Sequence, residues 1–331
     1  MTRIVCGMAG IGDIIFSLGL IAFGLLIGYL YRNQCPHGLR QSDEAINLLR
    51  RRLQAAALLF VNPIAFGGAI WALDLSDLRI IALPFLGLFA ITLGGVLAYI
   101  AAKVLGLSRK QTGVFVTCGS FTNIGSIGSL VTYILLGEAA VALMPFYKLF
   151  ETFLYYGVGF PYAKSMSDTA TENTPNRLLN ILTDKFVVVA VSSMAIGLGL
   201  NLMGIARPLF YPALNSVLIP LGTLLLLSSI GMAMRFGRIR GYLREATAIS
   251  LIKFIAVPGS VYLLGSMLGL GSVDGGLPLK VSVILASMPV AFTALVPPTL
   301  YDLDVDLANA AWFVTTVLLI VVVPGLWLIL A

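Results

Sequence analysis

The sequence predicts an all-α membrane protein with about ten transmembrane helices. The chain has 331 residues, of which 59% are hydrophobic and only 11% are charged. A soluble domain of this size carries about twice that charged fraction. The apolar residues also form long runs. Residues 214–234, 249–270 and 308–330 each approach or exceed the ~20 residues that cross ~30 Å of hydrocarbon as a helix. Since no segment between the runs is long enough to bury its own core, function is expected inside the helix bundle.

Ten predicted spans follow one another through short loops. They cover residues 12–31, 50–71, 80–104, 112–136, 139–163, 182–203, 212–234, 246–270, 277–300 and 306–330. The first is taken as a helix and not as a signal peptide, because its apolar run is longer than a usual h-region. Residues 1–165 and 182–331 therefore form two five-span halves. The polar stretch 166–181 between them contains Pro175 and is interpreted as a linker.

The distribution of basic residues predicts the orientation. Most of the 21 Lys and Arg residues fall in loops that follow odd-numbered spans. Lys253 is counted with the loop that precedes the eighth span. Loops rich in Lys and Arg stay in the cytoplasm. Both termini are therefore expected outside the cell membrane and the linker inside. The net charge of +6 suits anionic lipid and requires no nucleic-acid partner.

An odd number of spans in each half means that a second copy of the first half would be inverted in the membrane. A weak internal similarity supports such a repeat. Thr122-Asn123 begins a run that ends at Glu138, and Met288-Pro289 begins one of the same length that ends at Asp304. Each run starts in the fourth span of its half. The sequence thus predicts two inverted five-helix repeats.

The fourth and ninth spans are predicted to break at mid-membrane. Glycine and small polar residues gather in the middle of the fourth, and Pro289 interrupts the ninth. Such breaks survive in hydrocarbon only where protein or a water-filled cavity satisfies the freed backbone. Their amides favour a carboxylate, although close packing of small residues is the alternative for the fourth span. The candidate substrate-binding residues at the breaks are Thr122, Asn123, Gly125, Ser126, Pro289 and Thr293.

Two charged residues lie within the fifth span. Lys148 is near the middle of the bilayer, and Glu151 is three residues further on the same helix face. Ionisable residues at this depth are costly and usually functional. Lys148 is expected to attract the substrate, and Glu151 to change protonation and so couple transport to protons. The alternative is that the two charges merely neutralise each other.

Other chemistries find little support in the sequence. Cys6, Cys35 and Cys118 lie far apart and are interpreted as unpaired thiols. His37 is the only histidine and lies in a polar loop. Neither a metal site, a cofactor nor a hydrolytic triad is expected, and a single intramembrane glutamate argues against an enzyme.

Several motifs together resemble the auxin efflux carrier family. They are Phe121-Thr-Asn-Ile-Gly-Ser-Ile-Gly128, Leu136-Gly137-Glu138, Ala286-Ser-Met-Pro-Val-Ala-Phe-Thr293, Tyr301 and Leu307-Ala308. The resemblance implies a ten-helix inverted-repeat carrier of organic anions such as auxin, malate or malonate, similar in architecture to bile-acid sodium symporters. It also implies that Asn123 binds the substrate carboxylate and that Pro289 marks the second break.

The chain departs from the plant members of that family at two points. Thr122 and Leu130 stand where the plant pattern has prolines, which predicts a less sharp break in the fourth span. The long hydrophilic plant loop is absent, so the chain resembles the prokaryotic branch, and auxin itself is not the expected substrate.

The sequence therefore favours a secondary carrier that binds a small carboxylate between the fourth and ninth spans and works by alternating access. A sodium symporter of the bile-acid type is the first alternative; Thr122, Ser126, Ser129 and Thr293 would offer it hydroxyl ligands. A non-transporting receptor of the same fold is the second. Substrate, direction, coupling to protons or sodium, and assembly into a homodimer are left open.

Overall fold

The computed structural model describes residues 10–34, 43–75, 77–167, 183, 185–234 and 239–330. Within these residues the chain is helical, and the one β feature is an isolated antiparallel bridge between Thr122 and Val290. Some sequence predictions concern residues outside this set, namely Cys6, Cys35, His37 and residues 168–181 of the linker.

Six helices of the described residues are long and apolar enough to cross a membrane, and a pair bent by 45° makes up to seven. They coincide with seven of the ten predicted spans. They are α1 (Ile11–Gln34); α2–η1–α3 (Asp43–Ala56, Ala57–Val61, Asn62–Trp71); η2–α4 (Leu78–Ala82, Leu83–Val104); α11 (Lys185–Leu202); α12 (Tyr211–Gly231); η5–α13–η6–α14 (Ile239–Tyr242, Leu243–Leu251, Ile252–Ala256, Val257–Met267); and the bent pair α17–α18 (Val305–Val317, Leu319–Leu330).

The fourth, fifth and ninth predicted spans are interrupted. Their helices are α5 (Arg109–Ser120) and η3–α6 (Ile124–Gly128, Ser129–Leu136); α7 (Glu138–Tyr147) and α8–η4–α9 (Glu151–Leu154, Tyr155–Gly159, Phe160–Ser165); and α15 (Leu277–Ala286) and η9–α16 (Phe292–Leu295, Val296–Leu300). None of these pieces spans a bilayer alone. Ten crossings and the inverted repeat therefore remain predictions.

Wide π-helical turns recur in the described helices, and three of them precede a proline. They are η1 before Pro63, η4 before Pro161 and η6 before Pro258. A proline lacks the N–H of the i→i−4 ladder, and its ring clashes with the preceding turn. A wider turn at that point lets the helix continue, so these spans bend without breaking.

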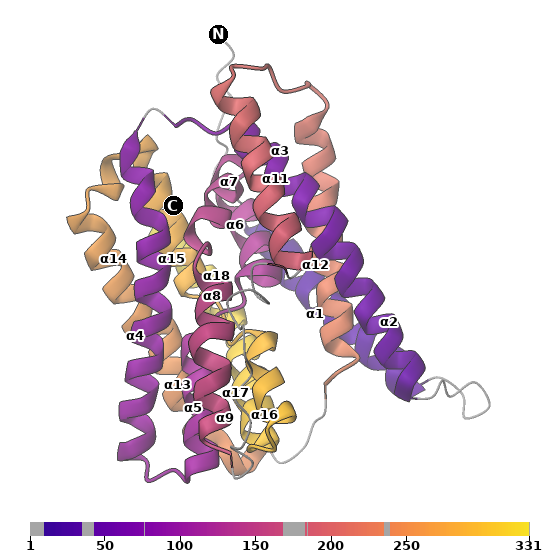
Figure 1. Ribbon diagram of the computed structural model, residues 1–331, viewed down its shortest axis with the longest axis vertical. Coiled ribbons are helices and arrows are strands. Elements are labelled where there is room, and N and C mark those ends of the chain that lie inside the picture. The colour runs from indigo at the N-terminus through magenta and orange to yellow at the C-terminus, as the bar shows by residue number, and fades with distance from the viewer. Residues whose placement is uncertain are drawn as a thin grey trace.

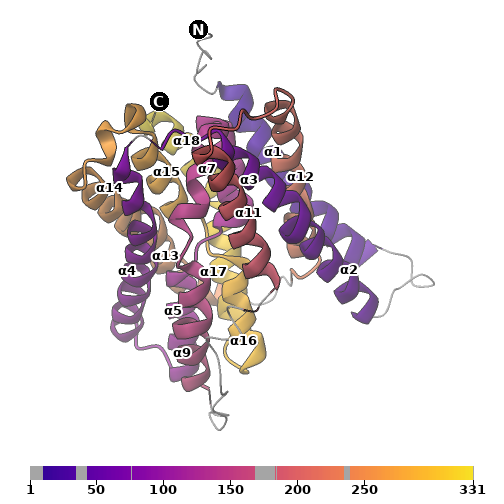
Figure 2. The same ribbon diagram turned by 45° about the horizontal axis from the view of Figure 1, so that its top comes forward.

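The helices form two groups by their packing; in both ribbon views α1, α2 and α12 lie on the right and α4, α13 and α14 on the left (Figure 1, Figure 2). We name α1, α2–η1–α3, α11 and α12 the panel group, in which α1 packs on α12 and α3 on α11. Small residues bring these backbones close: a methyl group on Gly28 of α1 would collide with the carbonyl oxygen of Ser228. This is the glycine-mediated packing common between membrane helices.

The remaining helices form what we name the core group. In it α4 packs on α5, α13 on α17 and α14 on α15. The two groups meet where α3 contacts α7 and where α12 contacts η3 and α6. Helix α12 therefore lies directly against the interruption between α5 and η3, which belongs to the core group.

Candidate functional site

The interruption between α5 and η3 meets the one between α15 and η9. After Ser120 the chain is extended at Phe121, and residues 121–123 run antiparallel to 289–291. The N–H of Asn123 donates to the carbonyl of Pro289 at 2.9 Å, and the N–H of Ala291 donates to the carbonyl of Phe121 at 3.0 Å. Each interruption thus satisfies part of the backbone that the other leaves free. We call this contact the crossover, with residues 121–123 as its first strand and 289–291 as its second. The first strand is extended although residue 122 is a threonine and not a proline.

Asn123 closes the first turn of η3 and retains an unused donor. Its Oδ1 accepts hydrogen bonds from the Ser126 hydroxyl and, at 3.5 Å, from the N–H of Ile127. Because a backbone N–H can only donate, this contact orients the side-chain amide. The Nδ2 group is then buried with no hydrogen-bond partner among the described residues. A buried donor without an acceptor is costly, and a carboxylate oxygen would supply one.

Lys253 lies at the crossover and not in the loop to which its position in the sequence was assigned. Its side chain is 1% exposed, and its Nζ donates to the Thr122 hydroxyl at 2.7 Å. Among the described residues it makes no other hydrogen bond and no ion pair. The assignment of Lys253 to a cytoplasmic loop is wrong, because the residue belongs to η6, well inside the eighth span. The predicted bounds of that span, 246–270, include position 253, so they already indicated that Lys253 lies within the membrane and not in a loop.

Lys148 and Glu151 flank the interruption between α7 and α8. The Lys148 Nζ lies 3.9 Å from Glu151 Oε2, so the two form the ion pair expected from their spacing. A methyl group on Gly125 would lie 3.8 Å from the same Nζ, which places the pair beside η3. Glu151 also interacts electrostatically with Lys253. One amino group therefore contacts the first strand of the crossover, and a second, paired with Glu151, lies beside η3.

The second strand contributes mainly backbone. Pro289 takes part through its carbonyl, and the buried N–H of Val290 donates to the Thr315 hydroxyl at 3.2 Å. Thr293 is exposed, and its carbonyl accepts the hydroxyl of Tyr155. The Tyr155 ring packs edge-on against Phe121 with the ring centroids 4.9 Å apart, so this tyrosine links the first strand to η9.

The structure thus brings most of the candidate residues together. Thr122, Asn123, Gly125, Ser126, Lys148 and Pro289 lie at or beside the crossover, with Glu151 paired to Lys148. Thr293 is joined to the group through its main chain only. Lys253 and Tyr155 are additional members.

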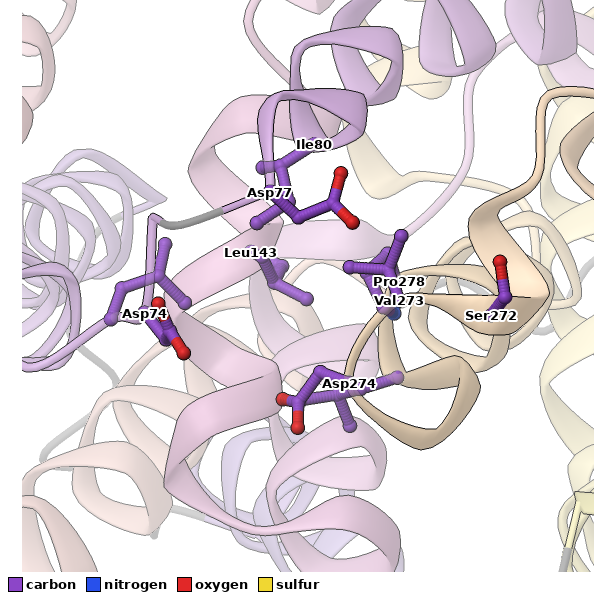
Figure 3. A pocket seen from close by; sticks show the side chains of 10 residues that line it. Asp74, Asp77, Ile80, Leu143, Ser272, Val273, Asp274 and Pro278 are labelled. Carbon is purple, nitrogen blue, oxygen red and sulfur yellow. The ribbon is translucent and has the colours of Figure 1, made fainter.

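A cavity of about 160 Å³ lies elsewhere, between the segment joining α3 to η2, α7 and the start of α15 (Figure 3). Asp74, Asp77 and Asp274 line it. The Arg79 guanidinium hydrogen-bonds Asp77 and lowers the pKa of that carboxyl to about 2, so the group is ionised at neutral pH. These carboxyl groups make the lining of the cavity acidic.

Among the described residues, no three His, Cys, Asp or Glu side chains gather in a way that could hold a metal ion. Cys118 is a buried free thiol.

A multi-pass helical bundle with two interrupted segments in contact among buried polar groups is characteristic of membrane transport proteins. The family model described as "Membrane transport protein" matches residues 57–327. The chain therefore belongs to this family, which is of the auxin efflux carrier type, and the resemblance seen in the sequence motifs is confirmed.

Two archaeal proteins illustrate the relationship. An uncharacterized transporter of Methanothermobacter thermautotrophicus is 24% identical over 92% of this chain and 93% of its own length. An uncharacterized transporter of Methanocaldococcus jannaschii is 27% identical over 76% of this chain and 79% of its own length. The chain is thus a multi-pass membrane transporter, and its family is not a family of enzymes.

Proposed function

We propose that the protein is a secondary active carrier of a small organic anion. The substrate carboxylate binds at the crossover, and the core group moves against the panel group to expose it to either side in turn. The observation that carries this proposal is the buried Nδ2 of Asn123, which lacks a partner among the described residues at a place bordered by two lysines.

The groups at the crossover match the needs of a carboxylate. An ionised carboxylate only accepts hydrogen bonds, and Asn123 Nδ2 donates. The amides of Gly125 and Ser126 lie in the first turn of η3, where an intrahelical acceptor is absent by geometry. The positive end of the η3–α6 dipole adds to this attraction. The Lys253 amine retains donor capacity beyond its bond to Thr122.

Glu151 gives the proposed carrier a means of coupling to protons. An anion that binds beside Lys148 competes with Glu151 for the same amino group. A carboxylate that loses its cationic partner in a low-dielectric site binds a proton more readily. Binding of the substrate would thus favour uptake of one proton by the protein, and an ion gradient would drive transport.

The sodium-coupled alternative has less support. Sodium would need several oxygen ligands near the crossover. There the Thr122 hydroxyl accepts from Lys253 and the Ser126 hydroxyl donates to Asn123, while two amino groups border the same space. A protonated amino group beside this space would oppose the binding of a second cation.

The test begins with a thermal-shift screen of purified protein against mono- and dicarboxylates, because a ligand that binds the folded state raises its stability. The stabilising acid is then used in proteoliposome uptake, with a pH gradient and with choline in place of sodium. Uptake should follow the pH gradient and persist in choline. A strict need for sodium would establish the symporter, and binding without flux would establish the receptor.

Lys148→Ala is the site-directed test of the same proposal. It removes an amino group beside η3, and hydrogen bonds to charged groups contribute about 1.5–3 kcal/mol, so affinity for the acid should fall roughly tenfold to a hundredfold. The matched control is Lys103→Ala, because Lys103 is exposed at the end of α4 and contacts the Tyr99 ring. Equal flux in both variants would remove Lys148 from the site.

A further inference from the structure

A second polar cluster, away from the crossover, joins the panel group to the core group. It consists of Glu138, Arg207 and Asn215, and we call it the Glu138 cluster. Arg207 forms a two-pronged ion pair, with Nη1 donating to Glu138 Oε1 and Nη2 to Oε2. Asn215 Nδ2 donates to Oε1 at 2.7 Å. Both carboxylate oxygens therefore have partners from the opposite group.

The two donors are themselves fixed to the panel group. Arg207 Nη1 also donates to the carbonyl of Gly68 at 3.0 Å, and Asn215 Nδ2 to that of Ala65 at 3.1 Å. Both carbonyls belong to α3. Arg207 lies in the segment between α11 and α12, and Asn215 in the second turn of α12. The donors are thus held in place on one side of the boundary, independently of Glu138.

Glu138 is fixed to the core group by a sharp turn. It is the first residue of α7, and it follows Gly137, whose φ of +80° ends α6. A carboxylate at this position also suits the positive end of the helix dipole. The side chains of Glu138 and Arg207 are only 18% and 15% exposed. In such a partly buried pair, loss of one partner leaves the other charge uncompensated, so the contact is sensitive to either residue.

The Glu138 cluster lies in line with the crossover. Asn215, Ile219 and Thr223 follow at intervals of four residues on one face of α12. The first contacts Glu138, and the Thr223 hydroxyl donates to the carbonyl of Ser126 in η3 at 3.2 Å. Eight residues of helix cover ~12 Å. Ile219, 3% exposed, fills the turn between. Figure 1 shows α3, α7 and α11 together at this end of the molecule.

We propose that the Glu138 cluster is a latch that holds the panel and core groups together at this end and has to open before substrate can pass between this side and the crossover. In the proposed alternating access, the closed state is held by one carboxylate on the moving core group and by two donors fixed to the panel group. This inference rests on the proposed function for what the latch is used for. Opening of the latch can be measured without a substrate, so its test does not depend on transport.

The test uses a cysteine at position 219 as a reporter of opening. Ile219→Cys is made in a background with Cys6→Ser, Cys35→Ser and Cys118→Ala, and the purified protein is labelled in detergent micelles with a charged maleimide. The reporter should react slowly while Glu138 is paired. Glu138→Gln and Arg207→Met should each raise the labelling rate at least tenfold, and Asn215→Ala should raise it less.

The charge exchange Glu138→Arg with Arg207→Glu tests the pairing itself, and it should return the labelling rate toward that of the reporter background. Asp77→Asn is the matched control, because Asp77 and Arg79 form an ion pair within the core group near the same end; its labelling rate should not change. Melting temperatures separate a latch from a structural ion pair, which would lower stability but leave labelling of the folded protein unchanged. Unchanged labelling in Glu138→Gln and Arg207→Met would overturn the proposal, as would a charge exchange that folds and labels as fast as the single variants.

Discussion

The two strands of the crossover differ in what they bring to it. The first carries polar side chains, Thr122 and Asn123, with Ser126 one turn further on. The second, Pro289-Val290-Ala291, carries none and interacts through its carbonyl and amide groups. The amino groups of Lys253 and Lys148 lie at Thr122 and beside Gly125, whereas the N–H of Val290 in the second strand donates to the Thr315 hydroxyl. Two interruptions in contact therefore need not share one role: in the proposed carrier the first strand binds the substrate, and the second satisfies the backbone of the first.

The largest effect is expected from Lys253→Met, which removes the buried amino group behind the first strand and keeps an apolar chain of similar length. If the first strand binds the carboxylate, affinity for the acid found in the screen should fall roughly a hundredfold, the upper range for a hydrogen bond to a charged group. Isothermal titration calorimetry measures it. Lys103→Met is the control at an exposed site, and an unchanged dissociation constant in Lys253→Met would assign Lys253 to folding alone.

Asn123→Ala should have the next largest effect. It removes the unpartnered Nδ2 and also the acceptor that the Ser126 hydroxyl uses. A loss of about tenfold in affinity is expected, as for one side-chain hydrogen bond. Asn123→Asp should be worse, because it places a carboxylate against a carboxylate. Asn47→Ala, on α2, provides the control. Tighter binding in Asn123→Asp would indicate a cationic substrate.

Thr315→Val tests the role of the second strand, because it should lower the free energy of unfolding more than it weakens substrate binding. The variant leaves the buried N–H of Val290 without its acceptor, at a cost of about 1–3 kcal/mol. Thr316→Val is a close control: among the described residues, the Thr316 hydroxyl donates to the Trp312 carbonyl of its own helix alone. Chemical unfolding in detergent compares the two. A large loss of affinity in Thr315→Val with little loss of stability would show that the second strand binds as well.

The smallest effect is expected at Asp77, which lines the acidic cavity away from the crossover. The Arg79 hydrogen bonds lower the pKa of Asp77 from 3.8 to about 2. A carboxyl whose pKa is depressed in the folded state stabilises the fold above its unfolded pKa and loses that contribution as pH falls through the folded value. Melting temperatures of wild type and Asp77→Asn should therefore differ slightly above about pH 4 and converge toward pH 2. Parallel curves across this range would contradict the assignment.

Much of the crossover could be predicted from the sequence, because chain interruptions have local causes. Glycine and small polar residues around Asn123 and the proline at 289 are weak helix formers wherever they stand. The pairing of Lys148 with Glu151 followed from their spacing of three residues, and it forms although the expected continuous helix is interrupted between α7 and α8. Lys253 shows where this reasoning failed: its distance along the chain from Thr122 conceals their hydrogen bond, and the charge count assigned it to a loop.

Composition, motifs and residues close together in the chain predicted the membrane class, the family and the breaks in the fourth and ninth spans. They did not predict the interruption of the fifth span between Tyr147 and Glu151. Which groups meet is visible only in the folded protein: Asn123 contacts Pro289, Lys253 contacts Thr122, and Glu138 contacts Arg207 and Asn215. Such contacts join residues far apart in sequence. They exist because helix packing brings buried polar atoms within reach of one another, and a local pattern carries no record of which partner a neighbouring helix will supply.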